Sequence, residues 1–196
     1  MRKEKLDELN NLIENYKTVE VFNKHKVDSG FLSIEQADYK LNNGKIINRD
    51  SLLKNNRDGS SCNVLAITKD KEVIFTVQPR VQLERTVGVE IPAGLIEDGE
   101  SPVEAIKREL LEETGYTSNN FIKLVRCYQD EGCSKAIVNS FLALDCEKIQ
   151  NQNLDDDEFI SVFTCNYDEA FELIDMGYIC GAFSIMALEM SKKYFK

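Results

Sequence analysis

The chain has 196 residues, a length typical of one domain or of one domain with a small appendage. Apolar residues make up 42% of it and charged residues 30%, so we expect it to fold around an ordinary hydrophobic core. Its net charge of -10 argues against a nucleic-acid partner, because proteins that bind nucleic acids normally present a basic surface.

Composition also bears on where the protein works and which sites it lacks. No run approaches the ~18 apolar residues of a membrane helix, and the charged first residues lack the apolar segment of a signal peptide. The 6 cysteines form no CxxC pair and most lie in apolar runs, so we expect them to be reduced and buried. These features predict a cytoplasmic protein with no membrane partner. The single histidine, His25, disfavours a zinc site or a histidine-based triad, and we expect it in a strand or on the surface.

The first third of the chain predicts one helix and then strands. Apolar residues at helical spacing predict an amphipathic helix over residues 1–17. Apolar runs predict strands at residues 19–22, 31–34 and 45–47, with Asn42-Asn43-Gly44 as a hairpin turn before the third. A polar loop over residues 54–61 follows.

The rest of the chain predicts strands on both sides of one central helix. The predicted strands are residues 62–68, 72–78, 87–91, 121–128, 136–145 and 159–164. The predicted helices are residues 101–114, 167–176 and 182–194. This order is typical of a mixed α/β sandwich.

The helix over residues 101–114 has clear start and stop signals. Ser101 is a favourable N-cap residue, Pro102 suits the first turn, and Glu104 completes a capping box. Gly115 stops the helix as the residue after the C-cap.

Three glutamates share one face of this helix near its C-terminal end. Glu109, Glu112 and Glu113 stand at i, i+3 and i+4, where like charges repel and the helix dipole is already negative. A divalent cation reverses both penalties, since carboxylate oxygens are ligands that Mg²⁺ takes. On their own, the three glutamates favour a solvated acidic face over a metal site, with Glu104 and Arg108 as a helix salt bridge.

The surrounding residues resemble the signature of the Nudix hydrolases, Gx5Ex7REUxEExGU, where U is a bulky apolar residue. The fixed positions are occupied by Gly94, Glu100, Arg108-Glu109-Leu110, Glu112-Glu113 and Gly115, and Tyr116 is a softer match to the last apolar position. The resemblance implies an α/β (α+β) fold with a mixed β-sheet sandwiched between helices. It divides the chain into an N-terminal helix and antiparallel strand extension over residues 1–53 and a Nudix domain over residues 54–196.

Segments outside the signature are similar to the ADP-ribose pyrophosphatase branch of that family. They include Gln78-Pro79-Arg80 and residues 89–94 before the signature, and residues 157–162 after it. This likeness implies an enzyme that cleaves the diphosphate bond of a nucleoside diphosphate derivative, with ADP-ribose giving AMP and ribose 5-phosphate. It also implies a homodimer in which the N-terminal strands take part.

The resemblance assigns roles to individual residues. Glu109 and Glu113 would be the main Mg²⁺ ligands, with Mn²⁺ as an alternative ion, and Glu112 would be a ligand or hold one in place. Residues with supporting roles are Ala93, whose carbonyl would be a further ligand, Glu100, which would reach the metal or Arg108, and Arg108, which would orient a carboxylate. The bound cation would neutralise the phosphates and activate a water molecule.

Two further sets of residues complete the predicted site. The acidic loop Asp155-Asp156-Asp157-Glu158 falls where the branch carries its catalytic base, and Glu158 aligns best, followed by Asp156. The alternative is that the acidic side chains of this loop are only exposed to solvent and take no part in catalysis. The predicted substrate contacts are Arg80, Arg85, Glu90 and Ser134. Either arginine can bind a phosphate or a partner chain through its planar fork, or can be structural.

One position departs from the branch. Glu131 stands where a proline is expected in the loop after the signature, although Gly132 and Ser134 fit. This difference leaves the metal chemistry unchanged and weakens the substrate assignment. The alternatives are a pyrophosphatase of a nucleotide-sugar, such as UDP-glucose or GDP-mannose, and a Nudix-fold sensor that binds a nucleotide without cleaving it.

Overall fold

A computed structural model describes residues 19–84 and 86–195 of the chain. The helix predicted over residues 1–17 lies outside the described residues. The chain divides into two compact units. The N-terminal unit comprises residues 19–59 and 128–136 of the described chain, and the C-terminal unit comprises residues 60–127 and 137–195.

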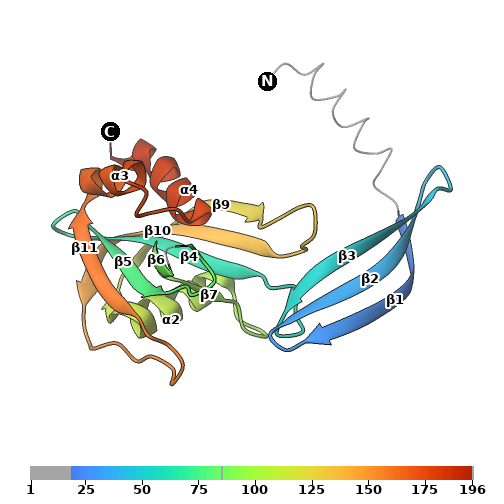
Figure 1. Cartoon of the computed structure of the whole chain (residues 1–196). Coiled ribbons are helices and arrows are strands. Elements are labelled where there is room, and N and C mark those ends of the chain that lie inside the picture. Colours follow the sequence, from blue (N-terminus) through green and yellow to red (C-terminus); the bar gives the residue numbers. More distant parts are fainter. Residues whose placement is uncertain (1–18, 85, 196) are drawn as a thin grey trace, which may run out of the picture. The chain divides into compact units, whose positions relative to one another are not determined.

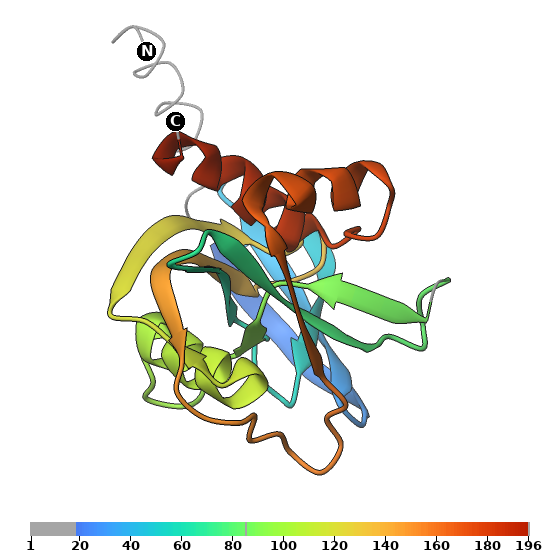
Figure 2. The same ribbon diagram turned by 90° about the vertical axis from the view of Figure 1, so that its left-hand side faces the viewer.

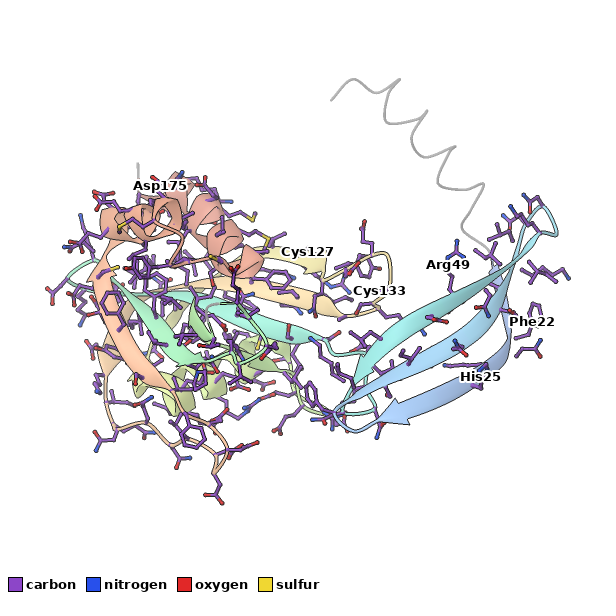
Figure 3. All side chains as sticks on the ribbon, viewed as in Figure 1. Phe22, His25, Arg49, Cys127, Cys133 and Asp175 are labelled. Atoms are coloured by element: carbon purple, nitrogen blue, oxygen red, sulfur yellow. The ribbon has the colours of Figure 1, made fainter. Side chains whose placement is uncertain are left out.

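The N-terminal unit is built on an antiparallel meander of three strands (Figure 1). They are β1 (Val19–Ser29), β2 (Leu32–Leu41) and β3 (Ile46–Lys54). All three strands were predicted. Each is longer than its apolar run, because the flanking polar residues also pair with the neighbouring strand. Figure 3 marks His25 on β1, where it is exposed, as expected for a strand or surface residue.

The segment 128–136 is attached to the third strand of this unit. The Leu52 amide donates to the Cys133 carbonyl at 2.7 Å, and the Lys54 ammonium donates to Gln129 at 3.1 Å. The Lys135 ammonium is paired with Glu35, a buried carboxylate of β2 that also binds Lys24 at 2.6 Å. The loop after the signature is therefore part of the N-terminal unit.

The C-terminal unit holds a mixed sheet with helices on both faces. Its strands are β4 (Ser61–Thr68), β5 (Glu72–Pro79), β6 (Val87–Glu90), β7 (Ala93–Leu95), β8 (Tyr116–Thr117), β9 (Asn120–Tyr128), β10 (Ile137–Lys148) and β11 (Ser161–Asn166). Its helices are α2 (Pro102–Thr114), α3 (Tyr167–Asp175) and α4 (Ala182–Ser191), followed by a 3-10 turn at Lys192–Tyr194. β4 and β10 are parallel, whereas the pairs β10–β8, β11–β5, β4–β5, β4–β7 and β5–β6 are antiparallel.

The sheet opens into a fork at its centre. β4 and β5 pair only at Ala66↔Ile74 and Ile67↔Val73 and then diverge. The consecutive strands β6 and β7 fill the gap, β6 pairing with β5 and β7 pairing with β4. Residues 96–101 connect the end of β7 to the start of α2.

Different helices cover the two faces of this sheet, as Figures 1 and 2 show. On one face, α2 buries Ala105, Ile106 and Leu110 against side chains of β4 and β10. On the other face, α3 and α4 cover a second buried cluster that includes Phe75 and Leu188. The observed architecture confirms the mixed α+β fold, with the two layers of helices fixed by these apolar faces.

The strands and helices of the C-terminal unit agree with the sequence prediction, apart from two short strands. β7 and β8 were not predicted, because strands of three and two residues carry no alternating pattern of their own. The described cysteines are free, but Cys133 and Cys180 are exposed, so the expectation of burial was wrong for these two. In the part of the chain that the structure describes, no helix is both long and apolar enough to cross a membrane.

Candidate active site

The helix α2 begins and ends as its sequence predicts. Ser101 adopts an extended conformation, and its hydroxyl and the Glu104 carboxylate form the two reciprocal bonds of a capping box. At the other end, Gly115 has a φ of 76°, in the left-handed region. A Cβ there would lie 2.2 Å from the Gln150 carbonyl oxygen, so the glycine also admits the loop that follows β10.

Arg108 joins three carboxylates of the signature. Its Nε and Nη2 atoms donate to Glu100 at 3.0 Å each, and Nη1 donates to Glu109 at 2.8 Å and to Glu112 at 3.2 Å. Nη2 also reaches the Leu95 carbonyl at 3.4 Å. The bond to Glu100 is the largest cause that raises the pKa of Arg108 and lowers that of Glu100. Of the two roles expected for Glu100, the structure shows the contact with Arg108.

Glu113 carries a buried carboxylate that forms no ion pair with the described residues. It is 4% exposed, and among those residues the only hydrogen bond to its side chain comes from the Ala93 amide, at 3.1 Å. Burial, followed by the charge of Glu109, raises the pKa of Glu113 to about 8. Burial also raises the pKa of Glu109, against the opposing effect of Arg108. Such a pair of carboxylates is costly to ionise unless a cation compensates.

The strand register turns the backbone of Ala93 toward this pair. The amide of Val64 donates to the Pro92 carbonyl and that of Ile96 to the Ser60 carbonyl, so the register partners Asn63 and Ala93 form a non-hydrogen-bonded pair. The N–H and C=O of Ala93 therefore face away from β4, on the edge where its N–H binds Glu113. The carbonyl predicted as a metal ligand shares that edge.

Gly94 is required by a close approach. A Cβ at this position would lie 1.9 Å from a carboxylate oxygen of Glu109 and 2.0 Å from its Cδ. No side chain fits there unless Glu109 moves. The glycine that opens the signature thus lets α2 place Glu109 directly against the backbone of β7.

The donor set suits a hard divalent cation. It consists of carboxylate oxygens and a main-chain carbonyl, which are the ligands that Mg²⁺ takes. Among the described residues, no group of three or more acidic, cysteine or histidine side chains is arranged closely enough to hold a metal ion. Arg108 pairs with Glu109 through Oε1 alone, which leaves the second carboxylate oxygen of Glu109 outside this bond.

The acidic loop is anchored to the C-terminal end of α2. The Gln152 side chain donates to the Glu113 carbonyl at 2.6 Å, and the Asn153 amide donates to the Glu112 carbonyl at 2.9 Å. Glu158 accepts a bond from the Asp155 amide at 3.1 Å, and its charge contributes to the raised pKa of Glu113. Asp156 is exposed and has no such contact with the described residues. Sequence analysis did not identify Gln152, because a glutamine in a polar loop carries no signal.

Arg80 and Glu90 form a bidentate pair. Nε of Arg80 donates to Oε1 of Glu90 and Nη2 donates to Oε2, both at 2.8 Å. The bond to Glu90 raises the pKa of Arg80, and the charge of Glu113 adds to this shift. The pair therefore lies within electrostatic range of the carboxylate cluster. Arg85, the other predicted phosphate contact, lies outside the described residues.

Ser134 belongs to the N-terminal unit. Its hydroxyl accepts a bond from the Ala136 amide at 3.0 Å, which shapes the turn. Together with Glu131, Lys135 and Arg49, it lines a pocket of about 290 Å³ within that unit. Figure 3 marks Arg49 on β3 and Cys133 on the loop. Glu131, which replaces the expected proline, is exposed.

The chain is similar to known proteins over most of its length. The NUDIX domain family matches residues 59–179. The ADP-ribose pyrophosphatase of Bacillus subtilis (strain 168) is 34% identical over 168 residues, which cover 85% of this chain and 88% of that protein. The methanol dehydrogenase activator of Bacillus methanolicus is 30% identical over 174 residues, covering 88% of this chain and 89% of that protein. A crystal structure of an ADP compounds hydrolase superposes with a TM-score of 0.76 at 21% identity, covering 91% of this chain and 94% of that one, and it supports the fold.

Proposed function

Because this chain belongs to the Nudix hydrolase family, we propose that it hydrolyses the diphosphate bond of ADP-ribose to give AMP and ribose 5-phosphate. The main support for this proposal is the contact between α2 and β7. There, the buried Glu113 and the neighbouring Glu109 face the backbone of Ala93 and Gly94. This is an oxygen-rich site for a cation, built by the residues that define the family signature.

A divalent cation, with Mg²⁺ as our first proposal and Mn²⁺ as the alternative, completes this site. Glu109, Glu113 and the Ala93 carbonyl would hold it, with Glu112 as a further ligand or as a support for one. When bound, the ion neutralises phosphate charge and lowers the pKa of a water molecule. Arg108 keeps Glu109 and Glu112 oriented through its two bonds from Nη1. Displacement at phosphorus then depends mainly on positioning and charge neutralisation.

Glu158 is our proposed general base, and Asp156 is the second candidate. In support, Glu158 is near enough to affect the pKa of both Glu109 and Glu113, and the loop that carries it is tied to α2 by Gln152. Replacing Glu158 with Gln should lower kcat by about 10²-fold or more, as expected when a general base is lost. The measurement is steady-state hydrolysis of ADP-ribose with Mg²⁺. Near wild-type turnover would assign the base elsewhere, and Asp156→Asn would then be tested.

The substrate assignment has one specific competitor. Glu131 replaces the proline expected in the loop after the signature, which favours a nucleotide-sugar as the alternative substrate. A panel of ADP-ribose, UDP-glucose, GDP-mannose and nucleoside triphosphates, assayed with Mg²⁺ and with Mn²⁺, separates these possibilities by their products. AMP and ribose 5-phosphate as the preferred products support our proposal. Tight binding of a nucleotide without turnover on any member would instead support a sensor.

We further propose that the protein is a cytoplasmic homodimer. The N-terminal unit exposes large apolar side chains, among them Phe31, Leu32, Ile34 and Ile46, as a surface that binds a second copy would do. The free cysteines support a reducing compartment. Sedimentation at micromolar concentration tests the dimer, and Leu32→Lys combined with Ile34→Lys should shift it toward monomer.

A further inference from the structure

The side-on contact between Arg80 and Glu90 uses both carboxylate oxygens. Arg80 follows the last residue of β5, and Glu90 ends β6, the strand that pairs with it. Nε and Nη2 of the guanidinium donate to the two oxygens of Glu90 at 2.8 Å each. Both carboxylate oxygens of Glu90 are therefore engaged by Arg80.

The same contact leaves the other edge of the guanidinium open. An arginine has five N–H donors in a planar fork, and the pair with Glu90 uses one on Nε and one on Nη2. In the described part of the chain, the remaining donors of Arg80 have no hydrogen-bond partner. The parallel N–H groups of Nη1 and Nη2 thus form a free end-on fork, which matches two oxygens of one phosphate.

Gly88 makes room for this arrangement. A Cβ built on Gly88 would lie 2.1 Å from Oε1 of Glu90, 2.9 Å from its Cδ and 3.0 Å from Cγ of Arg80. The backbone of Gly88 does not have a positive φ, so an alanine suits its conformation and is crowded by the side chains of the pair, most closely by the Glu90 carboxylate. The glycine is therefore needed for the side chain of Glu90 and not for the turn.

We propose that Glu90 is a positioning residue that holds Arg80 side-on, so that its open fork is preset for a phosphate of the substrate, and that Gly88 permits this arrangement. The inference rests on the proposed diphosphate hydrolysis and gives Glu90 a role other than the substrate contact implied by family resemblance. An unrestrained arginine would lose rotamer freedom on binding a phosphate. Glu90 removes that cost in advance.

Two substitutions disturb the pair by different routes. Glu90→Gln keeps the shape and removes the charge and one acceptor, whereas Gly88→Ala keeps every charge and displaces the carboxylate. With ADP-ribose and Mg²⁺, each should raise KM about tenfold and leave kcat within about threefold, as expected for loss of uniform binding. Because both act through the same contact, the double variant should be no worse than either single one.

Gly88 and Glu90 line a cavity of about 340 Å³, and two other residues of its lining, Glu84 and Gly181, provide matched controls. Glu84→Gln removes one exposed charge from the same hairpin. Gly181→Ala adds a methyl group whose nearest neighbour is Oγ of Ser184 at 3.6 Å, without touching Glu90. Both variants should keep the wild-type KM. In an Arg80→Ala background, Glu90→Gln should change KM by less than about twofold, because Glu90 acts only through Arg80.

A binding measurement provides a readout that does not depend on turnover. Calorimetric titration with the α,β-methylene analogue of ADP-ribose should give a Kd raised about tenfold in Glu90→Gln and in Gly88→Ala. An active wild type with unchanged KM and Kd in both variants would overturn the inference and leave the proposed function intact. An equal loss in Glu84→Gln would also overturn it, as a general charge effect. A wild type that cleaves no nucleoside diphosphate derivative would refute the proposed function itself. Circular dichroism identifies a variant that fails to fold, and the other variant then decides.

Discussion

Arg108 and Arg80 both contact glutamates in the C-terminal unit, but they use their donors differently. Arg108 donates to three carboxylates and to a main-chain carbonyl, whereas Arg80 donates only to Glu90 among the residues that the structure describes. An arginine whose donors are all engaged stabilises its surroundings, and one with a free edge remains available to a ligand. On our proposal, the number of partners thus separates an arginine that supports the carboxylates from one that contacts the substrate.

The largest effect should come from the carboxylate that neither arginine neutralises. Replacing Glu113 with Gln should lower kcat by at least ~10²-fold, as expected when a metal ligand is lost. The fold should persist, since a neutral amide suits a buried position better than an unpaired charge. Steady-state kinetics and thermal unfolding check both parts. Unchanged kinetics would remove Glu113 from the proposed metal site and leave the region around Arg108 with a structural role alone.

Arg108→Ala tests the arginine whose donors are all engaged. It should lower kcat by about 10–100-fold, because the groups that orient metal ligands commonly have effects of this size. It should also lower Tm by about 5 °C or more, since partly buried carboxylates lose their shared cation. Lys107→Ala removes an exposed charge from the same helix and is the control. Equal effects in the two variants would contradict the special role of Arg108.

Arg80→Ala should affect KM more than kcat or Tm, unlike Arg108→Ala. We expect KM to rise about tenfold while kcat changes less, because a phosphate contact acts in the ground state and in the transition state alike. Its Tm should stay within about 2 °C of the wild type, as expected for a partly exposed pair at the surface. A large loss of Tm without any change in KM would make Arg80 structural, and the comparison with Arg108 would no longer hold.

The smallest expected effect is a pH dependence of stability in metal-free protein. Burial raises the pKa of Glu113 from its ordinary value of 4.5, which applies to the unfolded chain, to about 8 in the folded protein. Between these two pH values the folded state therefore binds more protons than the unfolded state. The stability that this group contributes is complete below pH 4.5 and is lost as the pH rises through 8. Tm should therefore fall by several degrees from pH 5 to pH 8.

Two comparisons test whether Glu113 causes this decrease of Tm with rising pH. Saturating Mg²⁺ should weaken it, because the ion stabilises the ionised carboxylate and binds only the folded state. Glu113→Gln should reduce it as well, since the titrating group is gone. A metal-free wild type with the same Tm at both pH values would mean that Glu113 does not carry the raised pKa.

The sequence predicted those parts of the site whose signals are local. The capping box of Ser101 and Glu104 and the stop at Gly115 lie within one helix, so their spacing alone defines α2. The shared face of the glutamates follows from the helical period. These features need no knowledge of the rest of the fold.

Other parts of the site depend on strand register and on loops, which spacing does not reveal. Arg80 and Glu90 are ten positions apart and meet only because β5 pairs with β6. The contact that makes Gly94 necessary joins it to Glu109 on a different element. Gln152 acquires its role only when the loop after β10 folds back onto α2. Family resemblance located several of these residues, but only the structure shows what they touch.

The alternation of backbone groups along β7 affects how the site responds to mutation. The oxygen that Ala93 offers belongs to the main chain, so exchanging its side chain leaves that atom in place. An insertion or deletion of one residue in this strand would turn the oxygen toward β4, because adjacent residues present their carbonyls on opposite edges. We therefore expect the proposed metal site to tolerate substitutions at position 93 that keep the backbone N–H, and not to tolerate a change in the length of the strand.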